Sequence, residues 1–491
     1  MSRKLFGTDG VRGVAGELLS AELALGLGRA ATALAGAARP QVLIIRDTRE
    51  SGEMLQAALA AGVSAAGGDA LLGGVLPTPA APLLIARYGF DMAAVISASH
   101  NPYEDNGIKF FGADGFKLSD DTELQIEREL ERVAPTAGGD ARNGGGPNVR
   151  AGGEGGGERA HTDMAAAAGD DPASSGGDDP ASGGDDPAVA RAIGRVRELH
   201  GTGEDYLREL HTRFAALHLN GLDVLLDCAN GATHRVAPEI FRRLGASVAV
   251  IADSPDGRNI NDGCGSTHID RLAALVVEGG HAIGFAFDGD GDRVLAVDGE
   301  GVVVDGDELM ALTALHLKRS GRLSGGGVAV TVMTNYGFHA AMRGAGIEVA
   351  ATKVGDRYVL EELRARGWVL GGEQSGHIIE LDFNRSGDGI ASALLVLEAL
   401  AGAPLSERDA MHKLPQRLVN VRVGDREALA HAPTVSDAVK AADEALAGRG
   451  RVLVRPSGTE PLVRVMVEAP TDEEAEQVCS ELVALVEREL G

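Results

Sequence analysis

Gln41-Val-Leu-Ile-Ile45 and Met92-Ala-Ala-Val-Ile96 are the two stretches that decide the fold. Both are short, unbroken apolar runs, as expected for strands that are buried on both faces. Between them come a helical pattern at 53–66, another apolar run at 70–76 and a second helical pattern at 80–88. This alternation is a βαβαβ arrangement, which predicts a mostly parallel sheet covered by helices.

The same alternation returns twice further along the chain, from 222 to 287 and from 328 to 370. The end of the chain differs, because the strand-like and helical patterns between 418 and 490 indicate a small α+β unit. We therefore expect an α/β protein with three similar mixed or parallel α/β units and a C-terminal α+β domain. The expected domains are 1–194, 195–293, 294–405 and 406–491.

The composition is that of a folded, acidic protein. Hydrophobic residues make up 44% of the 491 residues, and the formal net charge is −26. Such a charge repels nucleic acid and anionic lipid, so neither is an expected partner. Cys228, Cys264 and Cys479 lack the spacing of a disulfide framework, and the first residues have no signal-peptide core. Both observations favour a cytoplasmic location, and no membrane span is expected.

Residues 135–194 differ in composition from the rest of the chain. They are rich in glycine and acidic residues, lack aromatic residues, and repeat Gly-Asp-Asp-Pro-Ala from Gly169, Gly177 and Gly184. With so little apolar surface to bury, such a segment cannot offset its ordering entropy. We expect a disordered insertion within the first domain. An acidic docking segment is the alternative, and the role of the insertion stays open.

The most specific motif is Asp288-Gly-Asp-Gly-Asp-Arg293, which follows an apolar strand-like run. Carboxylates at alternate positions point the same way, and the glycines let the chain bend around a cation. Oxygen ligands of this kind suit Mg²⁺, Mn²⁺ or Ca²⁺. An EF-hand is excluded, because its sixth position would be Arg293 and its twelfth Gly299. A solvated acidic turn is the alternative interpretation.

A second motif, Ser97-Ala-Ser-His-Asn-Pro102, also follows a strand of the first βαβ unit. Ser99 would lie at the carboxyl end of the sheet, where a serine can carry a phosphoryl group. On its own, the motif favours a turn serine that satisfies backbone groups. No Gly-x-Ser-x-Gly elbow is present, which disfavours acyl transfer.

Three other segments are suited to binding a phosphorylated ligand. Arg455-Pro-Ser-Gly-Thr-Glu-Pro461 offers a guanidinium, two hydroxyls and exposed backbone N–H groups, as in a phosphate cradle. Gly371-Gly-Glu-Gln-Ser-Gly-His377 could read vicinal sugar hydroxyls. Arg12 and Lys109 lie in glycine-rich contexts, where a plain surface charge is the alternative. No P-loop and no Gly-x-Gly-x-x-Gly at the first βα turn is found, which disfavours nucleotide cofactors.

In their order along the chain, these motifs resemble those of the α-D-phosphohexomutase superfamily. The matching segments are Gly7–Gly13, Ser97–Pro102, Asp288–Arg293, Gly372–His377 and Arg455–Pro461. Lys4–Gly13 and Thr352–Val359 further resemble the bacterial branch that acts on hexosamine phosphates. The resemblance covers about 1–134 and 195–491.

This resemblance implies a heart-shaped, four-domain enzyme with a central cleft, to which each domain contributes one loop. Its members are intramolecular phosphotransferases of the isomerase class. The hexosamine branch interconverts glucosamine 6-phosphate and glucosamine 1-phosphate on the way to UDP-N-acetylglucosamine, a peptidoglycan precursor. The reaction passes through a phosphoserine enzyme and a 1,6-bisphosphate. A phosphoglucomutase or phosphomannomutase is the alternative within the class; an inactive phosphosugar-binding regulator and a metal-dependent phosphatase are the alternatives outside it.

The resemblance also assigns roles to residues. It makes Ser99 the phosphoserine and a metal ligand, and Asp288, Asp290 and Asp292 the other ligands of one Mg²⁺ per subunit. Arg12, His100 and Lys109 become basic catalytic residues, without deciding which acts as acid or base. The substrate-binding residues it implies are Arg293, Glu373, Ser375, His377, Arg455, Ser457, Gly458 and Thr459. A hexosamine or glucose 1,6-bisphosphate is the expected activator. Ser99 would first be phosphorylated by a kinase or by itself, in a monomer or homodimer.

Overall fold

The computed structural model describes residues 5–7, 9–133, 193–457 and 461–491. Apart from Ile193 and Gly194, the expected insertion lies outside the described residues, as do Gly458 and Thr459. Gly194 is hydrogen-bonded to Ser64 through both its N–H and its C=O, at 3.0 and 2.8 Å. The chain that follows the insertion is therefore anchored on the helix of the first unit that contains Ser64.

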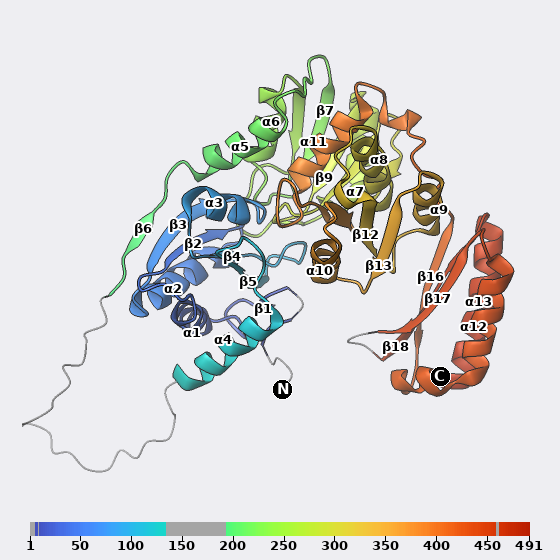
Figure 1. Cartoon of the computed structure of the whole chain (residues 1–491), viewed down its shortest axis with the longest axis horizontal. Helices are drawn as coiled ribbons and strands as arrows, with labels where there is room; N and C mark the ends of the chain where they lie inside the picture. Colours follow the sequence, from blue (N-terminus) through green and yellow to red (C-terminus); the bar gives the residue numbers. More distant parts are fainter. Residues whose placement is uncertain (1–4, 8, 134–192, 458–460) are drawn as a thin grey trace, which may run out of the picture. The chain divides into compact units, whose positions relative to one another are not determined.

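The first sheet has six strands in the order β1-β5-β4-β2-β3-β6 (Figure 1). The central pairs β4-β2 and β2-β3 are parallel, as the βαβαβ pattern predicted, whereas β5 pairs antiparallel to β4 and β1. Its strands are β1 (Val11–Val14), β2 (Gln41–Arg46), β3 (Asp69–Val75), β4 (Met92–Ile96), β5 (Asp105–Gly112) and β6 (Val196–Glu198). Its helices are α1 (Ala21–Ala33), α2 (Ser51–Ala65), α3 (Ala80–Tyr88) and α4 (Asp120–Val133).

Helices cover both faces of this sheet, which buries the apolar side chains at every central position of β2. Val42 and Ile44 pack in one core with α1 and α2. Leu43 and Ile45 point to the opposite face and pack in another core with α3 and with α5 (Thr202–Arg213). Adjacent strand residues alternate between faces, so an uninterrupted apolar run requires two covering layers.

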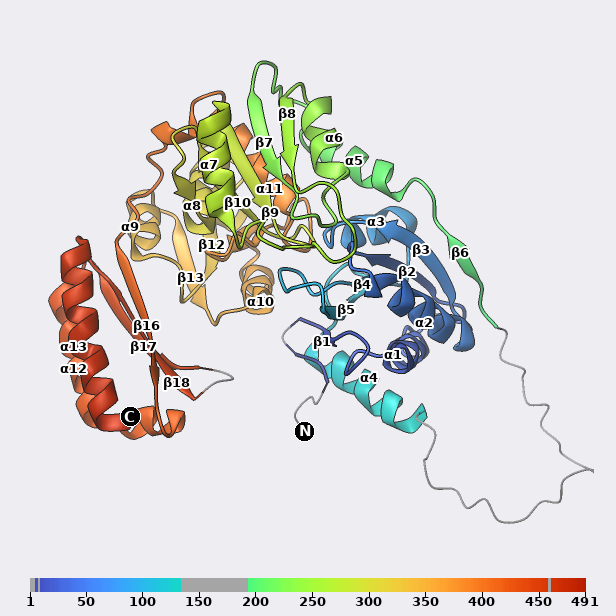
Figure 2. The same ribbon diagram turned by 180° about the vertical axis from the view of Figure 1, so that it is seen from behind.

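The second sheet has the order β11-β10-β9-β7-β8. Its parallel strands are β7 (Asp223–Asp227), β8 (Ser247–Ile251) and β9 (Ile283–Phe287), and its antiparallel strands are β10 (Val294–Asp298) and β11 (Val303–Val304). The helices α6 (Val236–Arg243) and α7 (Ile269–Gly279) pack on opposite faces. Figure 2 shows this unit from behind. Because β10 pairs with β9, this sheet continues past Arg293, the predicted end of the second domain. At the preceding boundary, β6 follows residue 195 but pairs with β3 and so belongs to the first sheet.

The third sheet has the order β13-β12-β14-β15, with only β15 antiparallel. Its strands are β12 (Gly327–Thr331), β13 (Glu348–Thr352), β14 (Leu370–Gly372) and β15 (Ile378–Glu380). The helices are α8 (Gly306–Arg319), α9 (Tyr336–Gly344), α10 (Asp356–Arg366) and α11 (Gly389–Leu400). Helix α11 is buried over nearly its whole length, which explains its almost wholly apolar sequence.

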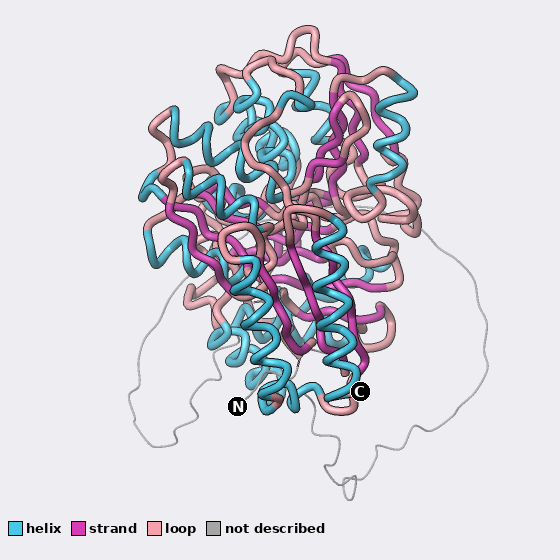
Figure 3. Tube along the Cα trace, turned by 90° about the vertical axis from the view of Figure 1, so that its right-hand side faces the viewer, coloured by secondary structure: helices cyan, strands magenta, loops and turns pink. Residues whose placement is uncertain are grey.

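The fourth sheet is an antiparallel layer, β16-β18-β17, with helices on one face (Figure 3). Its elements are β16 (Gln416–Arg422), α12 (Pro433–Leu446), β17 (Arg451–Pro456), β18 (Leu462–Glu468) and α13 (Asp472–Leu490). Val463, Val465 and Val467 alternate toward α12 and α13 and form a separate core. The four-unit α/β and α+β architecture predicted from the sequence is confirmed. Among the described residues, no helix combines the length and apolar character needed to span a membrane.

Candidate active site

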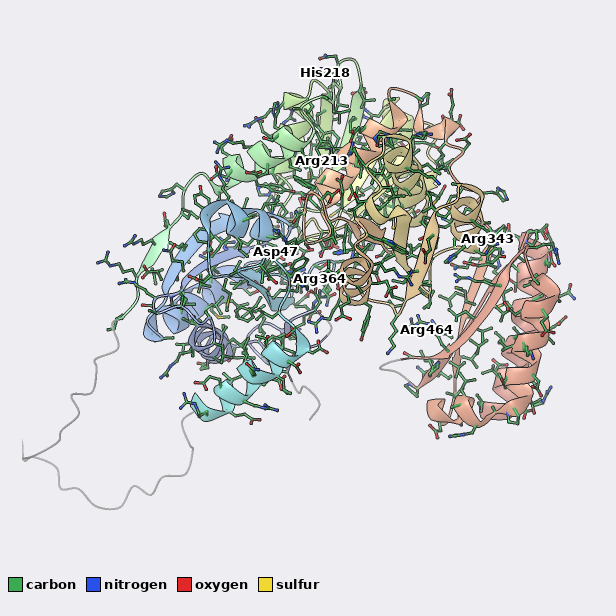
Figure 4. All side chains as sticks on the ribbon, viewed as in Figure 1. Asp47, Arg213, His218, Arg343, Arg364 and Arg464 are labelled. Atoms are coloured by element: carbon green, nitrogen blue, oxygen red, sulfur yellow. The ribbon has the colours of Figure 1, made fainter. Side chains whose placement is uncertain are left out.

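Ser99 lies on the loop that follows β4, at the carboxyl end of the parallel strands. Its backbone has a positive φ of 55°, which is rare for a residue with a side chain. The Ser99 N–H donates to Ser97 Oγ at 2.9 Å, and Ser97 Oγ donates in turn to Asp47 Oδ2 at 2.6 Å. Asp47 follows β2, the neighbouring parallel strand (Figure 4). Two strand ends thus fix the serine loop.

Arg49 holds the same loop from inside the protein. Its side chain is completely buried, pairs with Asp47 at 2.9 Å and donates to the carbonyls of Ser99 and Asn101, both at 2.8 Å. It also donates to the carbonyls of Pro102 and Asp105. These bonds offset the strain at Ser99, because the surrounding structure determines the loop conformation in several independent ways.

The second sheet brings its acidic loop to Ser99. The Ser99 hydroxyl donates to Asp288 Oδ2 at 2.6 Å, although the two residues are 189 positions apart in the chain. Asp288, Asp290 and Asp292 are buried, and one ligand atom of each lies within 4.8 Å of the others. Burial and the two neighbouring carboxylates raise the pKa of Asp288 well above its ordinary value.

This cluster fits a divalent cation. Among the described residues, Asp290 Oδ1 has no hydrogen-bond partner and Asp292 Oδ1 has only the longer contacts to His377 and Arg293, at 3.5 and 3.8 Å. Burial without close partners is costly for a carboxylate oxygen unless something binds it. All the candidate donors are oxygens, as Mg²⁺ prefers. The other oxygen of Asp290 accepts from Thr78 Oγ1 at 2.6 Å and Lys109 Nζ at 2.8 Å, so it is held in place.

The third sheet contributes Glu373 and His377 from the turn between β14 and β15. The Gly355 N–H donates to Glu373 Oε1 at 3.0 Å. His377 Nδ1 lies 3.5 Å from Asp292 Oδ1. Burial opposes a charge on His377, but Asp292 outweighs it, so the pKa of His377 is raised. Ser375 is exposed on the same turn.

These loops surround a cavity of about 520 Å³. The predicted site residues that line it are Arg12, Ser99, His100, Asp292, Arg293, Glu373 and His377. Such a volume suits a small polar ligand. His100 Nδ1 lies 3.3 Å from Ser99 Oγ, and burial together with Arg293 and Arg12 lowers the pKa of His100 to about 4.

The described residues of the predicted phosphate loop, 455–457 and 461, lie at the fourth sheet and are not among the residues that line this cavity. Ser457 is buried there, and Arg455 on β17 faces Arg464 on β18. Like charges directly across two strands destabilise a sheet, and no described residue is a hydrogen-bond partner of the buried Arg464 Nε. An anion would satisfy both guanidinium groups. Arg464, labelled in Figure 4, was not predicted.

Several other residues of the site were also missed by sequence reasoning. They are Asp9, Asp47, Arg49, Thr78, Lys117, Asn261 and Asp356. Asp47 and Arg49 follow a predicted parallel strand, so their position at the ligand-binding edge could have revealed them. Asn261 gave no such indication, although its Nδ2 donates to the Ser99 carbonyl at 2.9 Å.

Four family models match successive parts of the chain. They describe phosphoglucomutase/phosphomannomutase alpha/beta/alpha domains I (residues 3–136), II (204–301) and III (305–418), and the C-terminal domain (418–485). The chain therefore belongs to the phosphoglucomutase/phosphomannomutase family, the phosphohexomutases that its motifs resemble. These enzymes are isomerases.

Within the family, relatives that align over nearly their full length indicate which kind of mutase this chain is. The phosphoglucosamine mutase of Moorella thermoacetica is 50% identical over 484 residues, which are 98% of both chains. That of Mycolicibacterium smegmatis is 45% identical over 98% of this chain and 99% of the relative. The chain thus belongs among the phosphoglucosamine mutases, which favours this activity over the glucose and mannose alternatives.

Solved structures show the same fold at lower identity. A phosphoglucomutase/phosphomannomutase family protein from Burkholderia thailandensis has a TM-score of 0.73 at 22% identity and covers 100% of this chain and 98% of its own. An N-acetylphosphoglucosamine mutase from Aspergillus fumigatus, solved with GlcNAc-6P and magnesium, has a TM-score of 0.62 at 17% identity, covering 99% of this chain and 96% of its own.

Proposed function

We propose that this chain interconverts glucosamine 6-phosphate and glucosamine 1-phosphate through a phosphorylated Ser99. The observation that supports this best is the contact between Ser99 Oγ and Asp288 Oδ2 at 2.6 Å. It brings a candidate phosphoryl carrier and a candidate metal cluster together. The curated relatives supply the substrate class, since they are phosphoglucosamine mutases.

In this mechanism Ser99, Asp288, Asp290 and Asp292 would hold one Mg²⁺. When bound, the ion would neutralise charge on the transferring phosphoryl group and orient it. The magnesium in the Aspergillus fumigatus structure is consistent with this assignment. Lys109 holds Asp290, while Arg293 donates its backbone N–H to Asp288 Oδ1 at 3.2 Å, so the cluster is already ordered by the chain itself.

The phosphoryl group on Ser99 would pass to O1 or O6 of the sugar, which gives a 1,6-bisphosphate. The sugar then turns end for end and returns its other phosphate to Ser99. The Ser99 proton must leave at that step, and His100 Nδ1 and Asp288 Oδ2 both lie within reach of it. Arg12 and Arg293 line the cavity and would neutralise the reacting phosphate.

The sugar and the distant phosphate need separate contacts. Glu373, Ser375 and His377 would read the sugar, and Arg455, Ser457, Gly458 and Thr459 would hold the phosphate that does not react. The opposed guanidinium groups of Arg455 and Arg464 support an anion site at this place. Because the sugar binds in two orientations, this site must recognise charge and shape rather than one sugar hydroxyl pattern.

The remaining assignments extend this proposal. A hexosamine or glucose 1,6-bisphosphate would activate the enzyme by phosphorylating Ser99, with a kinase or autophosphorylation as other routes. Three buried free cysteines favour the cytoplasm. We assign 1–194, 195–293, 294–405 and 406–491 to four domains, except that β6 belongs to the first sheet and that β10 and β11 belong to the second.

The decisive experiment compares Ser99→Ala with Ser119→Ala, a substitution at an exposed serine of the same domain. We expect Ser99→Ala to lose mutase turnover on glucosamine 6-phosphate and Ser119→Ala to keep it. A Ser99→Ala enzyme with near-normal turnover would refute the phosphoserine mechanism. The ratio of kcat/KM on glucosamine 6-phosphate and glucose 6-phosphate tests the substrate, and it should favour the amino sugar.

A further inference from the structure

Six charged side chains beside the cavity form a closed ring in which acids and bases alternate. The contacts in order are Asp292 to Lys109 at 3.9 Å, Lys109 to Asp9 at 2.9 Å, Asp9 to Lys117 at 2.5 Å, Lys117 to Asp356 at 2.5 Å, Asp356 to His377 at 3.7 Å and His377 to Asp292 at 3.5 Å. The ring connects all three α/β sheets. Lys117 has no part in the mechanism above, and neither have Asp9 and Asp356, the two carboxylates that it bridges.

Lys117 joins the first and third sheets. It follows β5 in the first unit, and its ammonium lies 2.5 Å both from Asp9 Oδ1 and from Asp356 Oδ2. Only 10% of its side chain is exposed. Asp356 begins α10 of the third unit, and the next residue, Arg357, contacts Glu123 of α4 at 3.0 Å. The start of α10 is therefore bound to the first unit by two adjacent ionic contacts.

The start of α10 also determines where Glu373 points. Gly355 directly precedes Asp356 and donates its N–H to Glu373 Oε1 at 3.0 Å. Its φ of 129° is one that residues with side chains rarely adopt, so this amide is aimed by a special backbone conformation. Holding Asp356 in place therefore holds the amide that orients the Glu373 carboxylate.

We propose that Lys117 is a positioning residue for sugar recognition, which acts through Asp356 and the Gly355 amide on Glu373. The inference rests on the proposed function, because it takes Glu373 as a reader of hexose hydroxyls. Lys117 itself does not line the cavity and contacts no candidate metal ligand. Its loss should weaken binding of the hexose phosphate while leaving phosphoryl transfer intact.

The charge of Lys117 is what this role requires. If methionine replaced it, Asp9 and Asp356 would face each other without the shared cation. Two partly buried carboxylates in that position repel each other, and one of them must move or take up a proton. Asp9 keeps the cations Arg12 and Lys109 as partners, whereas the one cationic partner left to Asp356 among the described residues is His377 at 3.7 Å, beside the Arg357 N–H at 2.8 Å. The start of α10 is therefore the side that would shift.

The test measures the dissociation constant of glucosamine 6-phosphate by calorimetry and, separately, KM and kcat. Lys117→Met should raise Kd and KM about tenfold, as expected for losing a charge-assisted contact, with kcat within about twofold. Lys413→Met is the matched control, because Lys413 also bridges two carboxylates, Asp305 and Glu308, away from the cavity. It should leave Kd unchanged.

A second variant separates positioning from folding. Asp356→Asn keeps the side-chain shape and should raise Kd to a similar extent, and the double variant should be no weaker than either single one, because both cut the same link. If Lys117→Met does not fold, the Kd measured for Asp356→Asn tests the inference by itself. An unchanged Kd in the variant that folds, or additive effects, would overturn the inference. Absence of turnover in the unsubstituted enzyme would instead refute the proposed function, and the Kd comparison would still stand.

Discussion

Arg49 is the residue whose replacement should do most damage to the serine loop without touching the cavity. Its side chain is fully buried, pairs with the equally buried Asp47 and donates to four backbone carbonyls of 99–105. Arg49→Met would leave the Asp47 carboxylate without its counter-ion and remove one donor from each of the four carbonyls, although Asn261 Nδ2 would still donate to those of Ser99 and Asn101. Breaking a buried ion pair on one side costs about 3–5 kcal/mol. We expect a loss of this size in the free energy of unfolding.

The same change should lower turnover, because Ser99 would no longer be held at its positive φ. The assay is urea denaturation followed by circular dichroism, together with kcat on glucosamine 6-phosphate. Arg39→Met is the control, since Arg39 pairs with Asp69 at 2.8 Å but is about half exposed, and exposed pairs contribute about 1 kcal/mol or less. Equal losses in the two variants, or full activity in Arg49→Met, would refute the reasoning.

Three other predictions concern charge. Chelation with EDTA should lower the thermal stability of the unsubstituted enzyme in differential scanning calorimetry. Mg²⁺ at a hundredfold excess over its Kd should restore about 2.7 kcal/mol. Asp290→Asn should abolish this response to Mg²⁺. Burial raises the pKa of Asp388 to about 6 from an ordinary 3.8, so Asp388 destabilises the fold increasingly as pH rises from about 4 to about 6, and this cost is absent below that range. Asp388→Asn should remove about 2 kcal/mol of that pH-dependent loss between urea titrations at pH 4.5 and 7.5, and equal pH dependence in both proteins would contradict the assignment. Arg464→Gln should raise KM for the sugar phosphate several-fold, whereas Arg422→Gln, at an exposed position of β16, should not.

Much of the fold could be predicted because a buried strand is a short, local run of apolar residues. The run 92–96 is β4 itself, and 41–45 differs from β2 only at its last residue. Among the strands that were not predicted, β1 and β5 are antiparallel additions at the edge of the first sheet; β6, β10, β11 and β15 were not predicted either. β5 contains Asn106, Gly107 and Lys109, which do not read as a strand but are buried there because they serve the site.

The motifs that form the candidate site were predicted from the sequence, but the arrangement of their residues in space was not. Each motif marks a strand end, and parallel strands bring their carboxyl ends to one edge of their own sheet. Ser99 and Asp288 follow strands of different sheets, so it was the resemblance to the phosphohexomutases that led us to expect them in one site. Lys117 and Asn261 could not be found in this way. Their importance depends on which distant loop faces them, and no local pattern in the sequence encodes that contact.

The central claim is that Ser99 lends a phosphoryl group to the sugar and regains it. The most direct measurement is mass spectrometry of the Ser99 peptide before and after one turnover with ¹⁸O-labelled glucosamine 6-phosphate. The account predicts an unlabelled phosphate on Ser99 at the start and a labelled one afterwards, with the original phosphate recovered on the sugar. A Ser99 peptide that never carries phosphate while the enzyme turns over, or one whose phosphate does not exchange, would contradict it.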